Sequence, residues 1–270
     1  MIVQSASADG THFVIAMQQH TTFAGQLAAH FGNGQFAAIE PTEPMQFIVD
    51  NHDAGWIALD AEAPQSPDTG LPFNLTATPL PQIISTSAGS PALNEAHHAF
   101  SGIISSMHTY GLYTGRYGLS DKVFLDAIPA DLRPSVDEML AAEGERQQRL
   151  KGALASSDPD HGSNDFLFHA YKQLQFFDTL SLYFHMAPEG ERGSAEFLNV
   201  PRAVGDDVSI EVTELGEGRY DVMPFPFDVN ELKVSTEGRY LAPQTQGTSL
   251  PEVLAATPVS EQVVTLTGAS

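Results

Sequence analysis

Apolar residues recur every three or four positions through most of the chain up to Pro188. This spacing places them on one face of a helix and therefore predicts helical segments. The predicted helices cover residues 20–31, 44–56, 91–113, 135–154 and 166–186. The first is expected to end at Gly32, because glycine commonly terminates helices, and the last is the most apolar stretch of the chain.

The pattern changes after Pro188, where apolar and polar residues begin to alternate. Short runs rich in β-branched and aromatic residues predict strands, namely "DDVSIEVTE", "RYDVMPFPF" and "LKVSTEGRYL". Near the N-terminus, "IVQSASADGTHFVIAMQ" predicts a hairpin whose turn lies at Asp9 and Gly10.

These patterns predict a single, mainly α-helical domain over residues 1–242. Its helical body is expected to span about residues 18–188, and its β-rich part about residues 189–242. The N-terminal hairpin and the C-terminal strands are expected to form a small antiparallel sheet beside the helices. Residues 243–270 are expected to be a polar tail.

The chain has 34 acidic and 12 basic residues and a formal charge of -22. Binding to nucleic acid or to anionic lipid requires clustered lysine and arginine, so neither is an expected partner. The apolar runs are too short to span a bilayer and the N-terminus lacks a signal-peptide pattern, so a cytoplasmic location is expected. Cysteine is absent, and any metal site would therefore use histidine and carboxylate ligands.

Candidate chemistry begins in the segment "FIVDNHDAGW", where His52 and Asp53 interrupt an apolar run. In helical geometry His52 shares a face with Ile48 and Trp56, so the pair is expected to point inward. Burying ionisable groups is costly without a partner, and a metal ion would compensate for that cost. A hydrogen-bonded His-Asp pair at the helix surface is the alternative.

Three other predicted helices each carry one residue of metal-ligand type in apolar surroundings. His20 precedes Phe23, His108 follows "SGIISSM", and Asp178 lies within "LQFFDTLSLYF". A carboxylate so far inside a helix cannot cap that helix. The predicted metal ligands are therefore His20, His52, Asp53, His108 and Asp178.

The order of His20, the His52-Asp53 pair and Asp178 resembles that of the HD superfamily, the helical metal-dependent phosphohydrolases named for such a pair. The resemblance implies an HD-domain-like helical bundle that binds one or two divalent transition metal ions, with Fe, Mn and Co expected first. The words "QQHTTFAGQLAAHFG", "NHDAGW", "SSMHTYGLY" and "FFDTLSLYF" also resemble an uncharacterised bacterial family of unknown function, DUF3891, over most of the chain.

Two-metal members of the HD superfamily carry two more histidines between the pair and the last aspartate. His108 is a candidate for one of them, and His97 or His98 for the other. On one unbroken helix, His97 and His108 would lie about 16 Å apart, whereas two metal ions in one site lie about 3.5–4 Å apart. Either the helix breaks, with Gly102 as the candidate position, or only His108 binds. His108 is therefore the preferred ligand, and His97 and His98 are doubtful ones.

The superfamily resemblance implies a hydrolase that attacks a small phosphoester with metal-activated water. Asp53 and Lys172 are the expected catalytic residues, and the small-molecule substrate is expected to contact Trp56, Tyr113, Arg116 and Lys172. A diiron oxygenase that activates O2 is the runner-up, because aromatic residues surround the predicted ligands while basic residues are scarce. A non-catalytic binding protein stabilised by its metal is the third possibility.

Other chemistries lack their motifs. The sequence contains neither a nucleophile elbow nor a phosphate-binding loop of the Walker type, and no glycine-rich dinucleotide fingerprint. The proline-rich segment 63–82 is expected to be a long loop, and loops of this length often cover functional sites. Phe73 or its neighbours are expected to cover part of the pocket.

Overall fold

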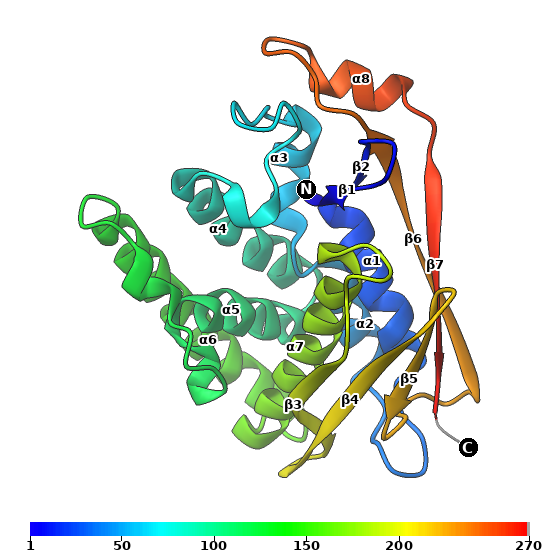
Figure 1. Cartoon of the computed structure of the whole chain (residues 1–270). Helices are drawn as coiled ribbons and strands as arrows, with labels where there is room; N and C mark the ends of the chain where they lie inside the picture. Colours follow the sequence, from blue (N-terminus) through cyan, green and yellow to red (C-terminus); the bar gives the residue numbers. More distant parts are fainter. Residues whose placement is uncertain (269–270) are drawn as a thin grey trace.

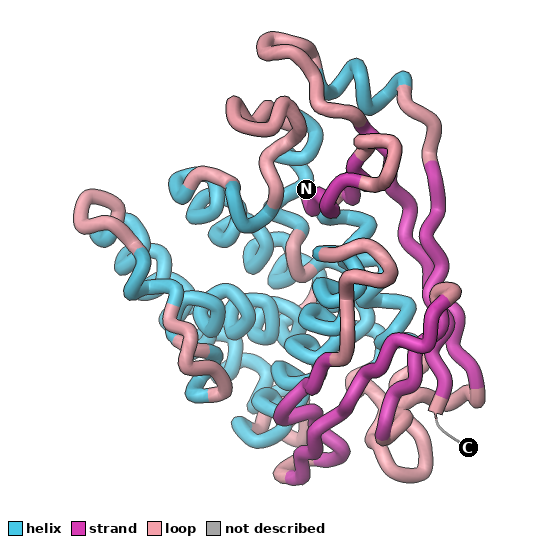
Figure 2. Tube along the Cα trace, in the orientation of Figure 1, coloured by secondary structure: helices cyan, strands magenta, loops and turns pink. Residues whose placement is uncertain are grey.

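The computed structural model describes residues 1–268 and combines a helical body with a large curled sheet (Figure 1). The strands form a curved wall along one side of the molecule, and most of the helices lie on the other side (Figure 2). Helices α1 (Met17–Ala29) and α7 (Asn164–Met186) lie between the sheet and the rest of the body, because both contact strands as well as other helices.

The other helices of the body are α2 (Thr42–Asn51), α3 (Ile57–Glu62), α4 (Leu80–His97), α5 (Ala99–Thr114) and α6 (Arg133–Ser157). Single 3-10 turns connect them, namely η1 (Ala54–Trp56), η2 (Leu75–Ala77), η3 (Arg116–Gly118) and η4 (Phe124–Ala127). Helix α5 contacts α2, α4, α6 and α7 and is buried over most of its length. No described helix combines the length and apolarity that a bilayer crossing requires.

The segment 91–113, expected as one helix, contributes to two. Helix α4 starts earlier, at Leu80, and ends at His97, and His98 has extended backbone with φ −155°. Nδ1 of His98 accepts a hydrogen bond from the backbone N–H of Phe100, 3.1 Å away, and so caps the first turn of α5. A side chain that satisfies a free N–H at this point favours a new helix start over continuation of the old helix.

The sheet contains β1 (Ile2–Ala6), β2 (His12–Ile15), β3 (Ala195–Ala203), β4 (Asp206–Gly216), β5 (Arg219–Met223), β6 (Glu231–Leu241) and β7 (Ser260–Thr267). These seven strands lie in the order β1-β2-β6-β7-β5-β4-β3. Strands β5 and β7 run parallel, and the other neighbours run antiparallel. The sheet is therefore mixed.

The expectation of an HD-domain-like helical bundle with a small antiparallel sheet is wrong. Alternate residues of the strands face inward, as strand geometry requires. Val212, Val222, Val234 and Leu266 are buried and belong to the same hydrophobic core as residues of α1, α5 and α7. The curled sheet thus forms part of the main core and is not an appendage of a helical bundle.

The expectation of a polar tail over 243–270 is also wrong for the residues that the structure describes. This segment forms α8 (Leu250–Ala256) and β7, and β7 lies between β6 and β5 in the sheet. Val264 is buried, whereas the preceding Val263 is exposed. The alternation in "SEQVVTLT" is a strand signal that the polar composition of the tail obscured. Residues 269 and 270 lie outside the described residues.

Candidate metal centre

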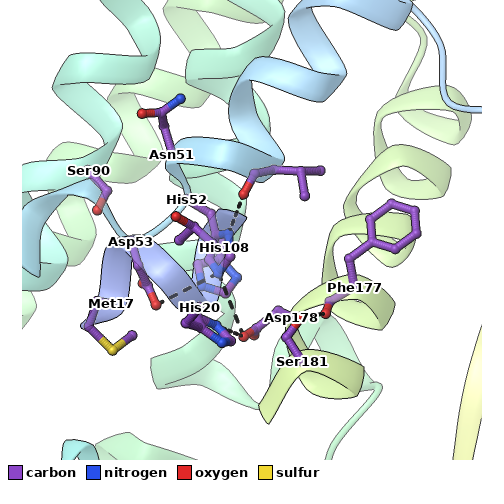
Figure 3. A network of polar contacts seen from close by, with 12 residues as sticks. Met17, His20, Asn51, His52, Asp53, Ser90, His108, Phe177, Asp178 and Ser181 are labelled. Atoms are coloured by element: carbon purple, nitrogen blue, oxygen red, sulfur yellow. Dashed lines mark hydrogen bonds and ion pairs between the residues drawn. The ribbon is translucent and has the colours of Figure 1, made fainter. Parts of the chain in front are cut away.

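Three of the predicted ligands meet inside the helical body (Figure 3). His20 comes from α1, His52 directly follows α2, and Asp178 comes from α7. Each offers one nitrogen or oxygen atom, and these atoms all lie within 4.8 Å of one another. The three residues are between 0% and 4% exposed. Two imidazoles and a carboxylate in this arrangement can hold a metal ion.

The contacts within this cluster converge on one carboxylate oxygen. Oδ1 of Asp178 lies 3.2 Å from Nε2 of His20 and 3.7 Å from Nε2 of His52. Ligand atoms that bind one ion at about 2.1 Å are separated from each other by about 3.0–3.5 Å. The observed separations are close to that spacing, so the residues present fit a metal ion.

His52 presents an unpaired nitrogen to the cluster. Its Nδ1 lies 2.8 Å from the carbonyl oxygen of Val49, which can only accept, so Nδ1 carries a proton. Its Nε2 is buried and has no hydrogen-bond partner within residues 1–268. The carboxylate oxygens of Asp178 and Asp53 lie 3.7 and 3.8 Å from that nitrogen. Histidine ligands of metals are commonly oriented in this way by a backbone carbonyl.

The electrostatics of the cluster favour a cation at Nε2 of His52. Burial alone lowers the pKa of this histidine, but the carboxylates of Asp53 and Asp178 outweigh burial and raise the pKa to about 9. Burial works in the opposite direction on Asp178, yet the hydrogen bond from His20 and the proximity of His52 hold its pKa well below the usual value. The cation at Nε2 is a proton in the metal-free protein, and a metal ion would take its place.

Helix α2 ends directly before His52 and Asp53. His52 still has helical backbone angles, whereas Asp53 has φ −108° and ψ 24°. Two residues later, the N–H of Gly55 donates to Oγ of Ser90 on α4 at 3.0 Å. A Cβ on Gly55 would overlap the carbonyl oxygen of Thr86, so only glycine permits this close approach. The turn places Asp53 beside His52 instead of on the next face of a straight helix.

His185, which was not among the predicted site residues, contacts His20 at the ring nitrogen that does not face Asp178. Its Nδ1 lies 3.3 Å from Nδ1 of His20, and both residues are buried. Burial holds the pKa of His185 well below its usual value, so this imidazole is neutral and can accept a hydrogen bond from His20. His185 follows Asp178 by seven residues on α7, which puts both on one face of that helix. That spacing is the signal from which it could have been found.

His108 lies beside the cluster. Its ring centroid is 5.4 Å from that of His52, and its Nδ1 lies 2.7 Å from Nε2 of Gln175 on α7. Burial lowers the pKa of His108 to about 4, so the ring is neutral at physiological pH. Its role as a ligand, like that of Asp53, stays a prediction.

His97 and His98 lie away from the centre. His97 stacks on Phe47 with 3.5 Å between ring centroids, and its Nε2 lies 2.8 Å from a carboxylate oxygen of Glu43. His98 caps α5. Both side chains therefore have other partners.

A cavity of about 420 Å³ opens onto His52, Asp53, His108 and Asp178. Three of the predicted substrate contacts, Trp56, Tyr113 and Arg116, line it. Lys172 does not line it. Its ammonium group is paired with both carboxylate oxygens of Asp207, at 2.5 and 2.6 Å, and it faces a neighbouring cavity of about 300 Å³.

The segment 63–82 contributes to the cavity through η2 and not through Phe73. Leu75 and Thr76 line the cavity, whereas Phe73 lies in a separate small pocket near Met1. Neighbours of Phe73, and not Phe73 itself, therefore cover part of the cavity.

Fold and site together define a helical protein with a curled mixed sheet and a buried cluster that could hold a metal ion. The chain belongs to the family described as "Protein of unknown function (DUF3891)", whose model matches residues 1–243. Searches of curated proteins and of solved structures gave no significant match.

Proposed function

We propose that this protein is a metal-dependent hydrolase that acts on a small phosphoester at the cluster of His20, His52 and Asp178. The observation that carries the proposal is the environment of His52. Its buried Nε2 has no hydrogen-bond partner among the described residues, faces two carboxylates and borders a cavity of ligand size. Histidine and carboxylate ligands suit Fe, Mn or Co, which are the expected metals.

A bound divalent ion would act as a Lewis acid and would lower the pKa of water toward neutrality. The residues around it have separate tasks. Asp53 lines the cavity with its side chain 17% exposed, and it is placed to accept a proton from the attacking water. Arg116 lines the same cavity and is placed to hold an oxyanion of the substrate. Lys172 has no catalytic role in this proposal, because Asp207 neutralises it and it does not line the cavity.

A diiron oxygenase is the second candidate, and the apolar lining of the cavity favours it. Trp56, Leu112, Phe124 and Leu182 line a large part of the cavity. A site for two ions would need more ligands than the three clustered residues. Asp53 and His108 are the nearest side chains that could supply them.

The test starts with protein purified without added metal, whose metal content is measured by mass spectrometry. Samples reconstituted with Mn²⁺, Co²⁺ or Fe²⁺ are then assayed for phosphate release from phenyl phosphate and hexyl phosphate. The hydrolase proposal expects metal-dependent release that falls at least 100-fold in Asp53→Asn while metal is still bound. Asp60→Asn, which changes a carboxylate outside the cavity, is the control for activity.

Three other outcomes would contradict the hydrolase. Oxygen consumption by the iron-loaded protein without phosphate release would support the oxygenase instead. Bound metal with neither activity would support a metal-stabilised binding protein. Failure of the purified and the reconstituted protein to retain any metal would contradict both enzymes.

A further inference from the structure

The cavity at the cluster combines an apolar wall with one guanidinium group. Aromatic and aliphatic side chains from η1, η2, α4, α5, η4 and α7 form the wall. They are Trp56, Leu75, Ile83, Leu112, Tyr113, Phe124 and Leu182. Hydroxyl groups of Ser87, Ser90 and Thr109 add a polar strip. Among the described residues that line the cavity, Arg116 is the only lysine or arginine.

Arg116 reaches this position through an unusual backbone. Gly115, Arg116 and Tyr117 have φ values of 75°, 53° and 57°, so three successive residues after α5 are left-handed. For a residue other than glycine this conformation is strained and persists where the surroundings enforce it. The turn brings the arginine back to the cavity that α5 lines.

The guanidinium group of Arg116 has no carboxylate within 4.0 Å in the part of the chain that the structure describes. Lys172, in contrast, is paired with Asp207. An unpaired guanidinium at an apolar cavity is suited to bind a planar or tetrahedral oxyanion.

We propose that the cavity binds a small amphiphile with an apolar body and a single oxyanion group, held at Arg116. This inference rests on the proposed function and specifies its substrate class. The apolar wall takes an aromatic or short alkyl body, and its burial supplies most of the binding free energy. One unpaired cation matches one oxyanion. Nucleotides and other polyphosphates, whose several charges need several cations, are disfavoured.

Trp56 makes this inference measurable. It is the only tryptophan of the chain, it is 5% exposed, and it lines the cavity. Intrinsic fluorescence therefore reports ligand binding in the cavity without a label. The probes are hexylphosphonate, which cannot be hydrolysed as an ester, together with hexanol, inorganic phosphate, hexanoate and ATP.

Hexylphosphonate is expected to bind at least 10-fold more tightly than hexanol, inorganic phosphate or ATP. Arg116→Gln is expected to remove the advantage over hexanol while the affinity for hexanol itself stays unchanged. Arg133→Gln is the control, because Arg133 is exposed on α6 and paired with Asp137. Hexanoate shows whether the oxyanion is a phosphate or a carboxylate, and tight binding of either supports the inference.

The titrations are performed on metal-free and on Mn²⁺-loaded protein. Equal affinity of hexylphosphonate for wild type and Arg116→Gln, or tighter binding of ATP than of hexylphosphonate, would overturn the inference. The proposed function fails separately: hexylphosphonate would bind as expected, but the metal-loaded protein would release no phosphate from hexyl phosphate.

Discussion

His20 and His185 face each other through their Nδ1 atoms, 3.3 Å apart, in the interior of the protein. A metal ion bound at Nε2 of His20 would leave the ring proton on Nδ1, and His20 would then donate this hydrogen bond to His185. In that arrangement His185 would hold the tautomer of His20 that presents the lone pair of Nε2 to the metal ion. His185 is thus a positioning residue for a metal ligand.

Replacing His185 should weaken metal binding without removing a ligand. We expect His185→Phe to lower metal affinity by about 10- to 100-fold, the usual effect of removing a hydrogen bond behind a histidine ligand. His185→Gln should recover part of that loss, because its amide oxygen can accept from His20. The measurement is the metal dissociation constant, obtained by competition with a chelator.

His169→Phe is the matched control for this prediction. His169 is another buried histidine on α7, but it does not line the cavity at the cluster. If His185→Phe bound metal as tightly as His169→Phe, the positioning role would be wrong.

The raised pKa of His52 predicts how the metal-free protein responds to pH. The pKa is about 9 in the folded protein against 6.5 for the free side chain. The protonated form therefore stabilises the fold fully below pH 6.5, and this contribution of about 3 kcal/mol is lost as pH rises through 9. Chemical denaturation of metal-free protein should show declining stability from pH 7 to 9.

Other buried histidines do not produce this decline. The pKa values of His108, His169 and His185 are lowered by burial, so these residues are neutral in both states above pH 7. The variant His52→Gln should therefore show a flat profile over the same range. Stability of the wild type that is constant or rises between pH 7 and 9 would refute the assignment of the charge to His52.

Two adjacent valines test the position of β7. Val264 is 3% exposed and faces the core, while Val263 is 49% exposed on the other face of the strand. Val264→Ala should lower the free energy of unfolding by about 2–3 kcal/mol, because it removes two buried methyl groups and leaves a cavity. Val263→Ala should change it by less than about 0.5 kcal/mol. Equal small effects at both positions would contradict a central β7.

The helices of the body follow closely from the periodicity of the sequence, but the sheet does not. Apolar residues three and four apart indicate α1, α5 and α7, whose buried faces dominate their composition. Strand β7 has a polar appearance, and its parallel partner β5 is about 40 residues earlier in the chain. Such long-range pairing leaves no local signal, so neither the order nor the size of the sheet was foreseeable.

In the candidate site, too, some residues could be predicted from the sequence and others only from the fold. His20, His52 and Asp178 were foreseeable because each is an ionisable residue in an apolar helical segment. The exclusion of Lys172 was not, because its partner Asp207 lies on β4 and only the fold brings the two together. Whether His97 or His98 could be a ligand depended on a break in the predicted helix. That break lies at His98, where a hydrogen bond from the N–H of Phe100 caps the new helix.

The central claim is that His20, His52 and Asp178 hold a divalent metal ion. Asp178→Asn tests it most directly, because the substitution keeps the shape of the side chain and removes the charge that two histidines share. Asp165→Asn, an exposed aspartate on the same helix, is the matched control. The measurement is metal content after dialysis against a graded series of chelator concentrations. Wild type and Asp165→Asn should retain their metal at chelator concentrations that strip Asp178→Asn, with at least a 10-fold difference in affinity. Full metal occupancy of Asp178→Asn, with the same chelator response as the wild type, would contradict the metal centre.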